Sequence, residues 1–378
     1  MVILQNRAAA LIANPDNTKV LNLDSLIRIR RHLHQHPEVS GEEFQTTLFL
    51  AEQLGDAGIP FLLGPEQRGL IVDLGNTSAA DKLAIRADID AIPVQDLKDV
   101  DYQSQNKGAM HACGHDAHST ILLGTIFQIQ QHLSRMPSER GIRCIFQPEE
   151  ETAVGASRLI QAGVLNNVGS IVAVHVDPNR PTGRIGLRNG TITAHCTEIN
   201  VTVTGRGGHA ARPREAIDPI EVAVDYIHEC YRQIPRERSE DYPVVLSITA
   251  FHGGESNNVV PETVKLTGTM RSLDQSARQD ALNKMSTIAH SLEQLTGAQI
   301  DLRFGLVVPS VVADEKMNAF IAGIAGNTLG SDKIDRIPEP SMGGEDFSFY
   351  CERVPASFIR LGCRGEQQGH LPLHNPHF

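Results

Sequence analysis

The chain has 378 residues, of which 40% are hydrophobic and 21% charged, and its formal net charge is -11 at pH 7. This length exceeds what one hydrophobic core usually serves, so we expect two domains. The negative charge, with no basic run beyond residues 28–32, argues against a nucleic-acid partner. The apolar run at residues 8–13 is too short to span a membrane and lacks a signal-peptide layout, which favours a cytoplasmic protein with no membrane partner.

The first half of the chain has β-rich runs that alternate with helical stretches. Ser40 and Glu43 have the spacing of a capping box before a helix that begins at Phe44 and ends near Gly58. The β-rich runs are residues 70–75, 82–90, 141–151 and 170–178, and helical stretches cover residues 119–133 and 155–163. This alternation predicts an α/β domain with a largely parallel sheet and flanking helices.

The pattern changes near residue 191. The order becomes strand, helix, strand, strand, helix, strand, which is the split βαβ arrangement of a ferredoxin-like α+β domain. These elements are residues 197–205, 218–234, 243–251, 263–271, 276–295 and 298–304. A helix at 317–329 and a strand at 356–362 then rejoin the first sheet. We therefore expect a first domain made of residues 1–190 and 305–378, and an inserted domain at 191–304.

Charged and imidazole side chains end the predicted strands of the first domain. Asp88 and Asp90 close the second strand, the glutamates at 149–151 close the third, and His175 closes the fourth. Ligands of open α/β sheets bind beyond the carboxyl ends of the strands, so we expect these groups to meet the loop at 111–118. Carboxylates gathered there would repel one another unless cations compensated them, which predicts divalent metal ions.

The loop HACGHDAH adds a thiol to these ligands. A Cys113 thiolate beside imidazoles and carboxylates suits zinc, manganese, cobalt or nickel better than calcium or magnesium. One further carboxylate is available to take a proton from water, as a hydrolase requires. Taken alone, however, the loop is equally well explained as a polar helix start. The stripe of His32, His34 and His36 is interpreted as imidazoles near a helix C-terminus rather than a metal site.

Eight motifs together give the chain, from about residue 25 onwards, a strong resemblance to the M20 metallopeptidases. Within that family it is similar to the amidohydrolase branch, which includes hippurate hydrolases, N-acyl-amino-acid amidohydrolases and indoleacetyl-amino-acid hydrolases. The motifs are RADIDAIP, HACGHDAH, FQPEEE, VHVDP, GRGGHAARP, NVVP, GGEDFSFY and LHNPHF. Each is weak evidence alone, and their shared order carries the resemblance.

The resemblance implies two divalent metal ions per subunit. The implied ligands are Cys113 as the bridging thiolate, His115, Glu151, His175 and His374. It further implies that Glu150 is the general base, that Glu149 is a bystander, and that Asp90 orients a ligand histidine.

The resemblance also implies that the first domain is the metal-binding catalytic domain and that the inserted domain is a lid or dimerisation domain. It implies roles for residues of the inserted domain. His209 matches a histidine that stabilises the oxyanion and that the partner subunit of a dimer often supplies, so we expect a homodimer or homotetramer. Asn258 and Arg271 match groups that hold the substrate carboxylate, and Gly344 lies where substrate passes close to the backbone. Closure of the inserted domain is expected to assemble this site.

The implied function is metal-dependent hydrolysis of the amide bond of an N-acyl amino acid, which releases a carboxylic acid and a free amino acid. Two alternatives remain open: a dipeptidase or aminopeptidase of the same family, and a non-catalytic metal-binding or ligand-binding homologue. The motifs do not determine the acyl group, because pocket shape decides it.

Overall fold

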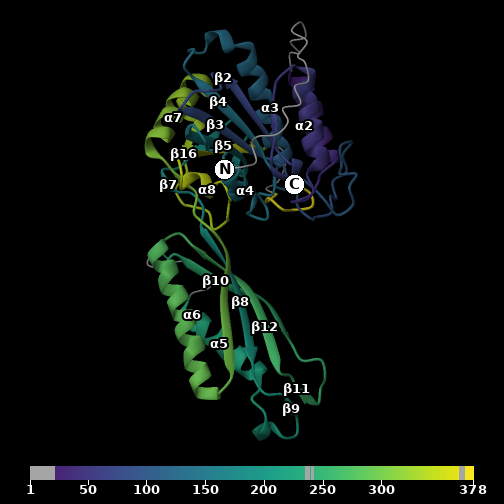
Figure 1. Ribbon diagram of the computed structural model, residues 1–378, viewed down its shortest axis with the longest axis vertical. Coiled ribbons are helices and arrows are strands. Elements are labelled where there is room, and N and C mark those ends of the chain that lie inside the picture. Colours follow the sequence, from purple (N-terminus) through teal and green to yellow (C-terminus); the bar gives the residue numbers. More distant parts are fainter. Residues whose placement is uncertain (1–21, 235–238, 240–241, 366–370) are drawn as a thin grey trace. The chain divides into compact units, whose positions relative to one another are not determined.

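The computed structural model describes residues 22–234, 239, 242–365 and 371–378 (Figure 1). The apolar run at 8–13 lies outside these residues. Within them, every helix is too short or too polar to cross a membrane. The chain divides into two compact units. Unit 1 comprises Met1–Ile192, Val311–Pro338 and Glu345–Phe378, and unit 2 comprises Thr193–Ser310 and Glu339–Gly344.

Unit 1 is built on an eight-stranded sheet in the order β1-β2-β4-β3-β5-β16-β6-β15. Its centre, β4-β3-β5-β16, is parallel, and β1, β2 and β6 pair antiparallel with β2, β4 and β16 respectively. The strands are β1 (Leu62–Leu63), β2 (Leu70–Gly75), β3 (Lys82–Asp88), β4 (Gly141–Gln147), β5 (Val168–Pro181), β6 (Ile185–Leu187), β15 (Ile334–Arg336) and β16 (Ala356–Arg364). The predicted largely parallel sheet is therefore confirmed. A separate pair joins β7 (Gly190–Thr191) to β14 (Val312–Ala313).

Helices cover both faces of the unit 1 sheet. Successive strand residues point to opposite faces, so Cys144 and Phe146 of β4 pack against α1, α2 and α3, while Ile145 packs towards α4 and α8. Burial on both faces explains why these strands are almost continuously apolar. The helices are α1 (Leu23–Gln35), α2 (Phe44–Asp56), α3 (His115–Gln131), α4 (Gly155–Gln161), α7 (Glu315–Leu329) and α8 (Ser348–Cys351).

The capping box predicted before α2 is wrong, although the helix itself begins at Phe44 as predicted. The Ser40 hydroxyl donates to the Asp90 carboxylate, and the Glu43 carboxylate accepts the backbone N–H of Glu149. The Glu38 carboxylate instead accepts the first N–H groups of the helix. Two residues that resembled a local cap are thus used for long-range contacts.

Unit 2 has a four-stranded antiparallel sheet, in the order β10-β12-β8-β13, with α5 and α6 packed on one face (Figure 1). Asp218 and Asp274 cap the two helices with their side chains, and Gly297 ends α6 with a φ of 76°. The elements are β8 (His195–Thr204), β9 (Gly208–His209), α5 (Pro219–Gln233), β10 (Val244–Gly253), β11 (Val259–Val260), β12 (Thr263–Ser272), α6 (Gln275–Thr296) and β13 (Gln299–Val308). This is the predicted ferredoxin-like order. The predicted domain limits of 191 and 304 stay a prediction.

Two phenylalanines of unit 1 offer a test of the core. Phe358 of β16 is 1% exposed, whereas Phe320 of α7 is 63% exposed. We expect Phe358→Ala to lower the free energy of unfolding by about 3–5 kcal/mol, because it removes a fully buried ring. Phe320→Ala should change it by less than about 0.5 kcal/mol. Urea denaturation followed by circular dichroism measures both, and similar losses in the two variants would contradict this packing.

Candidate metal centre and active site

The loop before α3 is shaped by a glycine. Gly114 has a φ of 83°, and a Cβ at this position would lie 2.5 Å from Cγ2 of Val176. Only glycine satisfies both the left-handed backbone and this close approach. The turn places Cys113 just before the helix and His115 at its first residue. The loop is therefore a polar helix start as well as a group of candidate ligands, and the two interpretations do not exclude one another.

His115 is held by Asp90. Its Nδ1 lies 2.9 Å from the Asp90 carbonyl oxygen and 3.2 Å from Oδ1, so Nδ1 carries the proton and donates it. Both residues are fully buried. Among the described residues, His115 Nε2 has no hydrogen-bond partner. A buried imidazole nitrogen with a free lone pair is the usual geometry of a metal ligand whose other nitrogen is oriented by a carboxylate.

The other candidate ligands gather around this nitrogen. The ligand atoms of Cys113, His115 and His175 lie within 4.8 Å of one another, as do those of Cys113, Glu151 and His374. Cys113 Sγ is 3.6 Å from His175 Nε2, and His374 Nε2 is 3.3 Å from Glu151 Oε1. Cys113 belongs to both sets, so the two groups of candidate ligands adjoin one another. The residues therefore fit a pair of divalent metal ions.

The electrostatics of the cluster favour cations. Burial raises the pKa of the Cys113 thiol to about 12. Burial, followed by the charges of Glu345, Glu151 and Asp346, raises the pKa of Glu150 well above its ordinary value. Such groups lose their protons at neutral pH only when a positive charge compensates them. A thiolate together with imidazoles and carboxylates suits zinc and neighbouring transition metals.

His175 does not end its strand as predicted. β5 runs six residues further, to Pro181, because β16 continues to pair with it at His175 and beyond. Arg86 of β3 pairs with Ala173. His175, two residues along, is therefore level with the end of β3. The neighbouring strand ends there, and this exposes His175 to the cluster from within a strand.

The three consecutive glutamates after β4 do not share one environment. β4 ends at Gln147, earlier than predicted, and Glu149 then has a φ of 59°. The Glu149 carboxylate contacts Arg158 at 2.7 Å and belongs to no candidate metal group formed by the described part of the chain. Glu150 and Glu151 lie beside His115, with carboxylate oxygens 4.0 and 3.9 Å from its Nε2. In an extended strand these three side chains would point alternately to opposite faces. The turn at Glu149 instead directs its carboxylate away from those of Glu150 and Glu151.

Sequence reasoning missed a buried charge network beside Glu150. The Arg86 guanidinium donates to Asp88, to Asp346 at 2.8 Å and to Glu345 at 3.1 Å. The backbone N–H of Asp346 lies 3.4 Å from Glu150 Oε1. An arginine within an apolar strand was the available signal, because a buried guanidinium requires carboxylate partners.

Several nearby histidines have structural contacts. His118 Nδ1 lies 2.6 Å from Asp88 Oδ1 and its Nε2 accepts the Val176 N–H, which makes Asp88 a partner of His118. His34 bonds Asp116 at 2.6 Å, and His36 bonds a carbonyl of α1 at 2.8 Å. None of His32, His34 and His36 belongs to a candidate metal group of the described residues.

The four predicted site residues of unit 2 form two pairs. Val259 of β11 pairs with His209, and the Asn258 carbonyl accepts the Ala210 N–H, so these neighbours lie together. Arg271 lies beside Gly344, where an added Cβ would be 3.4 Å from its Nη1. Arg271 is next to the end of β12, and β9 and β11 lie beyond the other end of that sheet (Figure 1).

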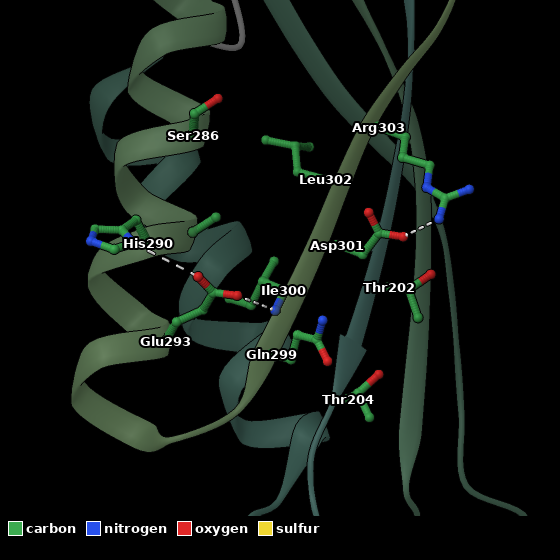
Figure 2. Close-up of a pocket in the computed structure, with 11 residues that line it drawn as sticks. Thr202, Thr204, Ser286, His290, Glu293, Gln299, Ile300, Asp301, Leu302 and Arg303 are labelled. Carbon is green, nitrogen blue, oxygen red and sulfur yellow. Dashed lines mark hydrogen bonds and ion pairs between the residues drawn. The ribbon is translucent and has the colours of Figure 1, made fainter.

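A cavity of about 650 Å³ lies elsewhere in unit 2, between α6 and the edge strand β13. Figure 2 shows Glu293 bridging His290 and the backbone of Ile300, with Asp301 paired to Arg303 nearby. None of the predicted site residues lines this cavity. It is therefore separate from the groups discussed above.

Comparisons with known proteins identify related sequences and structures. The profile of peptidase family M20/M25/M40 matches residues 84–378. The N-acetylcysteine deacetylase of Bacillus subtilis is 36% identical over 349 residues, covering 92% of this chain and 90% of the relative. Thermostable carboxypeptidase 2 of Saccharolobus solfataricus is 34% identical over 360 residues, covering 94% and 90%. A crystal structure of a Bacillus subtilis protein, described as a dinuclear metal-binding peptidase of the M20 family, has a TM-score of 0.78 at 33% identity and covers 93% of this chain and 91% of that chain.

The contacts of Asp90 lead to a prediction on metal affinity. Asp90→Ala removes the acceptor that orients His115 and the one that binds the Glu151 N–H. We expect zinc affinity, measured by competition with a chromogenic chelator, to fall about 10–100-fold. Asp73→Ala is the control, because Asp73 also forms ion pairs in unit 1 but lies outside the candidate groups. Equal affinity in Asp90→Ala and the native protein would contradict the orienting role.

Proposed function

The chain belongs to peptidase family M20/M25/M40 and is a metallo-hydrolase, and from this premise we propose that it hydrolyses the amide bond of N-acyl amino acids. The products are a carboxylic acid and a free amino acid. The observation that carries the proposal is the position of Glu150, a buried carboxylate beside two ligand sets that share Cys113. In this proposal Glu150 is the proton acceptor beside a dinuclear metal site. We further propose the cytoplasm as its location.

Two divalent metals supported by this site would polarise the acyl carbonyl and make water a better nucleophile. Zinc is the first choice, with manganese, cobalt and nickel as alternatives, because the ligands include a thiol and imidazoles. Cys113, His115, Glu151, His175 and His374 would hold them. Asp90 keeps His115 in the tautomer whose Nε2 is free to bind.

Glu150 is the general base of this proposal. It takes a proton from the attacking water and delivers it to the nitrogen of the departing amino acid. Burial and the nearby carboxylates of Glu345 and Asp346 raise its pKa, which helps Glu150 to retain that proton between the two steps. The backbone N–H of Asp346 faces one of its oxygens and orients the carboxylate.

The substrate class follows from a feature common to two relatives. A deacetylase of N-acetylcysteine and a carboxypeptidase, as their names state, both release an amino acid whose carboxylate is free. Arg271 is proposed to bind this carboxylate, because a planar guanidinium matches two carboxylate oxygens. Gly344 leaves the space beside Arg271 open, since any side chain there would also meet the Cys196 sulfur at 2.7 Å.

His209 is proposed to stabilise the oxyanion. It is exposed, and its Nδ1 accepts the Ala211 N–H at 3.1 Å, so its Nε2 carries a proton that it can donate. Asn258 lies beside it and is proposed to bind the substrate carboxylate as well. Arg271 pairs with Cys196 near one end of β8. Thr204, at the other end of β8, is eight residues further along, which corresponds to about 26 Å of strand.

This span exceeds the length of an N-acyl amino acid. One small substrate therefore does not reach Arg271 at one end of the unit 2 sheet and His209 at the other end of the same sheet. Closure of the inserted domain of a single chain, as expected from the sequence, does not remove this separation. We propose that a second copy of the chain supplies His209 and Asn258, in a homodimer or homotetramer.

Peptide hydrolysis is the second candidate function, because one relative is named a carboxypeptidase. A dipeptide also presents a free carboxylate beyond its scissile amide, so it differs from an N-acyl amino acid only in the acyl half. A panel of hippurate, N-acetyl-L-cysteine, other N-acetyl amino acids and two dipeptides separates the candidates.

We expect Glu150→Gln to lower kcat on the best panel substrate by about 10²–10⁴-fold, because an amide does not accept the proton. Metal content, measured by mass spectrometry, should stay unchanged. Glu149→Gln is the matched control and should retain most of kcat, since the Glu149 carboxylate points to Arg158. If Glu149→Gln lost kcat and Glu150→Gln retained it, Glu149 rather than Glu150 would be the general base. Chelation should abolish the native activity, and added zinc, manganese or cobalt should restore it.

The carboxylate assignment predicts a change in KM. Arg271→Met should raise KM for an N-acetyl amino acid about 10–100-fold with little effect on kcat, because it removes a charged hydrogen bond to bound substrate. The native enzyme should show a similar loss on the corresponding C-terminal amide. Arg303→Met, in the same unit, is the control. An aminopeptidase that ignores the substrate carboxylate would show neither loss.

A further inference from the structure

We propose that Glu43 is the positioning residue for Glu150: it fixes the turn that presents the general base, although it takes no part in the chemistry. This inference rests on the proposed function, which assigns Glu150 its role. Glu43 lies just before α2 and is 106 residues away from the turn in sequence. It belongs to no candidate metal group of the described residues, so it acts through geometry.

The contacts of Glu43 are those of an internal anchor. Its side chain is fully buried. Oε1 accepts the backbone N–H of Glu149 at 2.9 Å and that of Gly41 at 3.0 Å, while Oε2 accepts Nη1 of Arg68 at 3.0 Å. A buried carboxylate that is paired and hydrogen-bonded in this way has one arrangement available to it, because any other leaves its charge unpaired.

The residue that Glu43 binds is in a strained conformation. Glu149 has a φ of 59°, in the left-handed region, which is unfavourable for a residue with a Cβ. Arg68 and Arg158 add contacts to its carboxylate at 3.3 and 2.7 Å. The bond from the Glu149 N–H to Glu43 therefore opposes a relaxation to the right-handed region. Such a relaxation would rotate the peptide that leads into Glu150.

A second buried carboxylate holds the other side of Glu150. Asp90 Oδ2 accepts the backbone N–H of Glu151 at 2.9 Å. Glu150 thus lies between two backbone N–H groups, each bound by a carboxylate from a distant segment. Asp90 also orients His115, whereas Glu43 contacts no predicted ligand. Loss of Glu43 should therefore disturb the turn that carries Glu150 and Glu151, while Cys113 and His115 stay in place.

The test compares Glu43→Ala with Asp73→Asn, which removes another ion-paired carboxylate of unit 1 far from the turn. We expect Glu43→Ala to lower kcat on the best N-acyl amino acid about 10–100-fold, with KM unchanged, since displacing a catalytic group by about 1 Å has this effect. Asp73→Asn should leave both constants near native values. Equal constants in Glu43→Ala and native enzyme would overturn the proposal.

Cobalt substitution provides a readout that does not need turnover. The band from the Cys113 thiolate to cobalt should persist in Glu43→Ala, because Cys113 lies on another loop, while the d–d bands should shift as the neighbouring Glu151 moves. A d–d spectrum identical to that of the native protein would contradict the positioning role. If the native enzyme cleaves no N-acyl amino acid, the proposed function fails, yet the spectra still test Glu43.

Three further variants cover a failure of Glu43→Ala to fold. Glu43→Gln keeps one acceptor oxygen, so it should fall between Ala and native in kcat. Glu149→Gly and Glu149→Val both keep the backbone N–H, but only glycine adopts a positive φ without strain. We expect the glycine variant to keep most of kcat and the valine variant to lose it with KM unchanged. Loss of kcat in neither variant would overturn the proposal.

Discussion

The arrangement of unit 1 depends on burying negative charge at the carboxyl edge of a parallel sheet. Asp88, Asp90 and Glu150 are buried there, and an isolated buried carboxylate is costly. The protein offsets part of this cost with the Arg86 guanidinium and with the hydrogen bonds of His115 and His118. The charge that remains uncompensated faces Cys113 and the free nitrogen of His115, which is where divalent cations fit.

This constraint accounts for the unusual backbone at the edge. The groups that meet there come from segments far apart in the chain, and sharp turns aim them inwards. Gly114, Glu149 and His374 all have a positive φ, two of them without the freedom of glycine. The His374 N–H donates to the Ala112 carbonyl, which joins the last turn to the loop that carries Cys113. Local strain is thus accepted where long-range hydrogen bonds hold it.

In unit 2 the candidate residues are not gathered at one edge of the sheet. Its core is a conventional antiparallel sheet under two capped helices, and its candidate residues lie at the two ends of that sheet. Arg271 and Gly344 are at one end, and His209 and Asn258 are at the other. A rigid sheet of this length keeps the two pairs apart, which is the observation that supports the proposed assembly of two copies. The length of the unit 2 sheet in one chain is thus the structural basis of the proposed assembly.

Sequence alone determined the fold class, the ferredoxin-like order of unit 2 and the family, because hydrophobic periodicity and motif order are properties of neighbouring residues. It also predicted which of three glutamates is not a ligand candidate. Only the tertiary structure decided the partners of Ser40 and Glu43, the place of His175 within a strand, and the network of Arg86. Ser40, Glu43 and Arg86 bind partners 50 or more residues away, and His175 lies within a strand because β16 pairs beside it. A local pattern does not record which distant group or strand supplies such a contact.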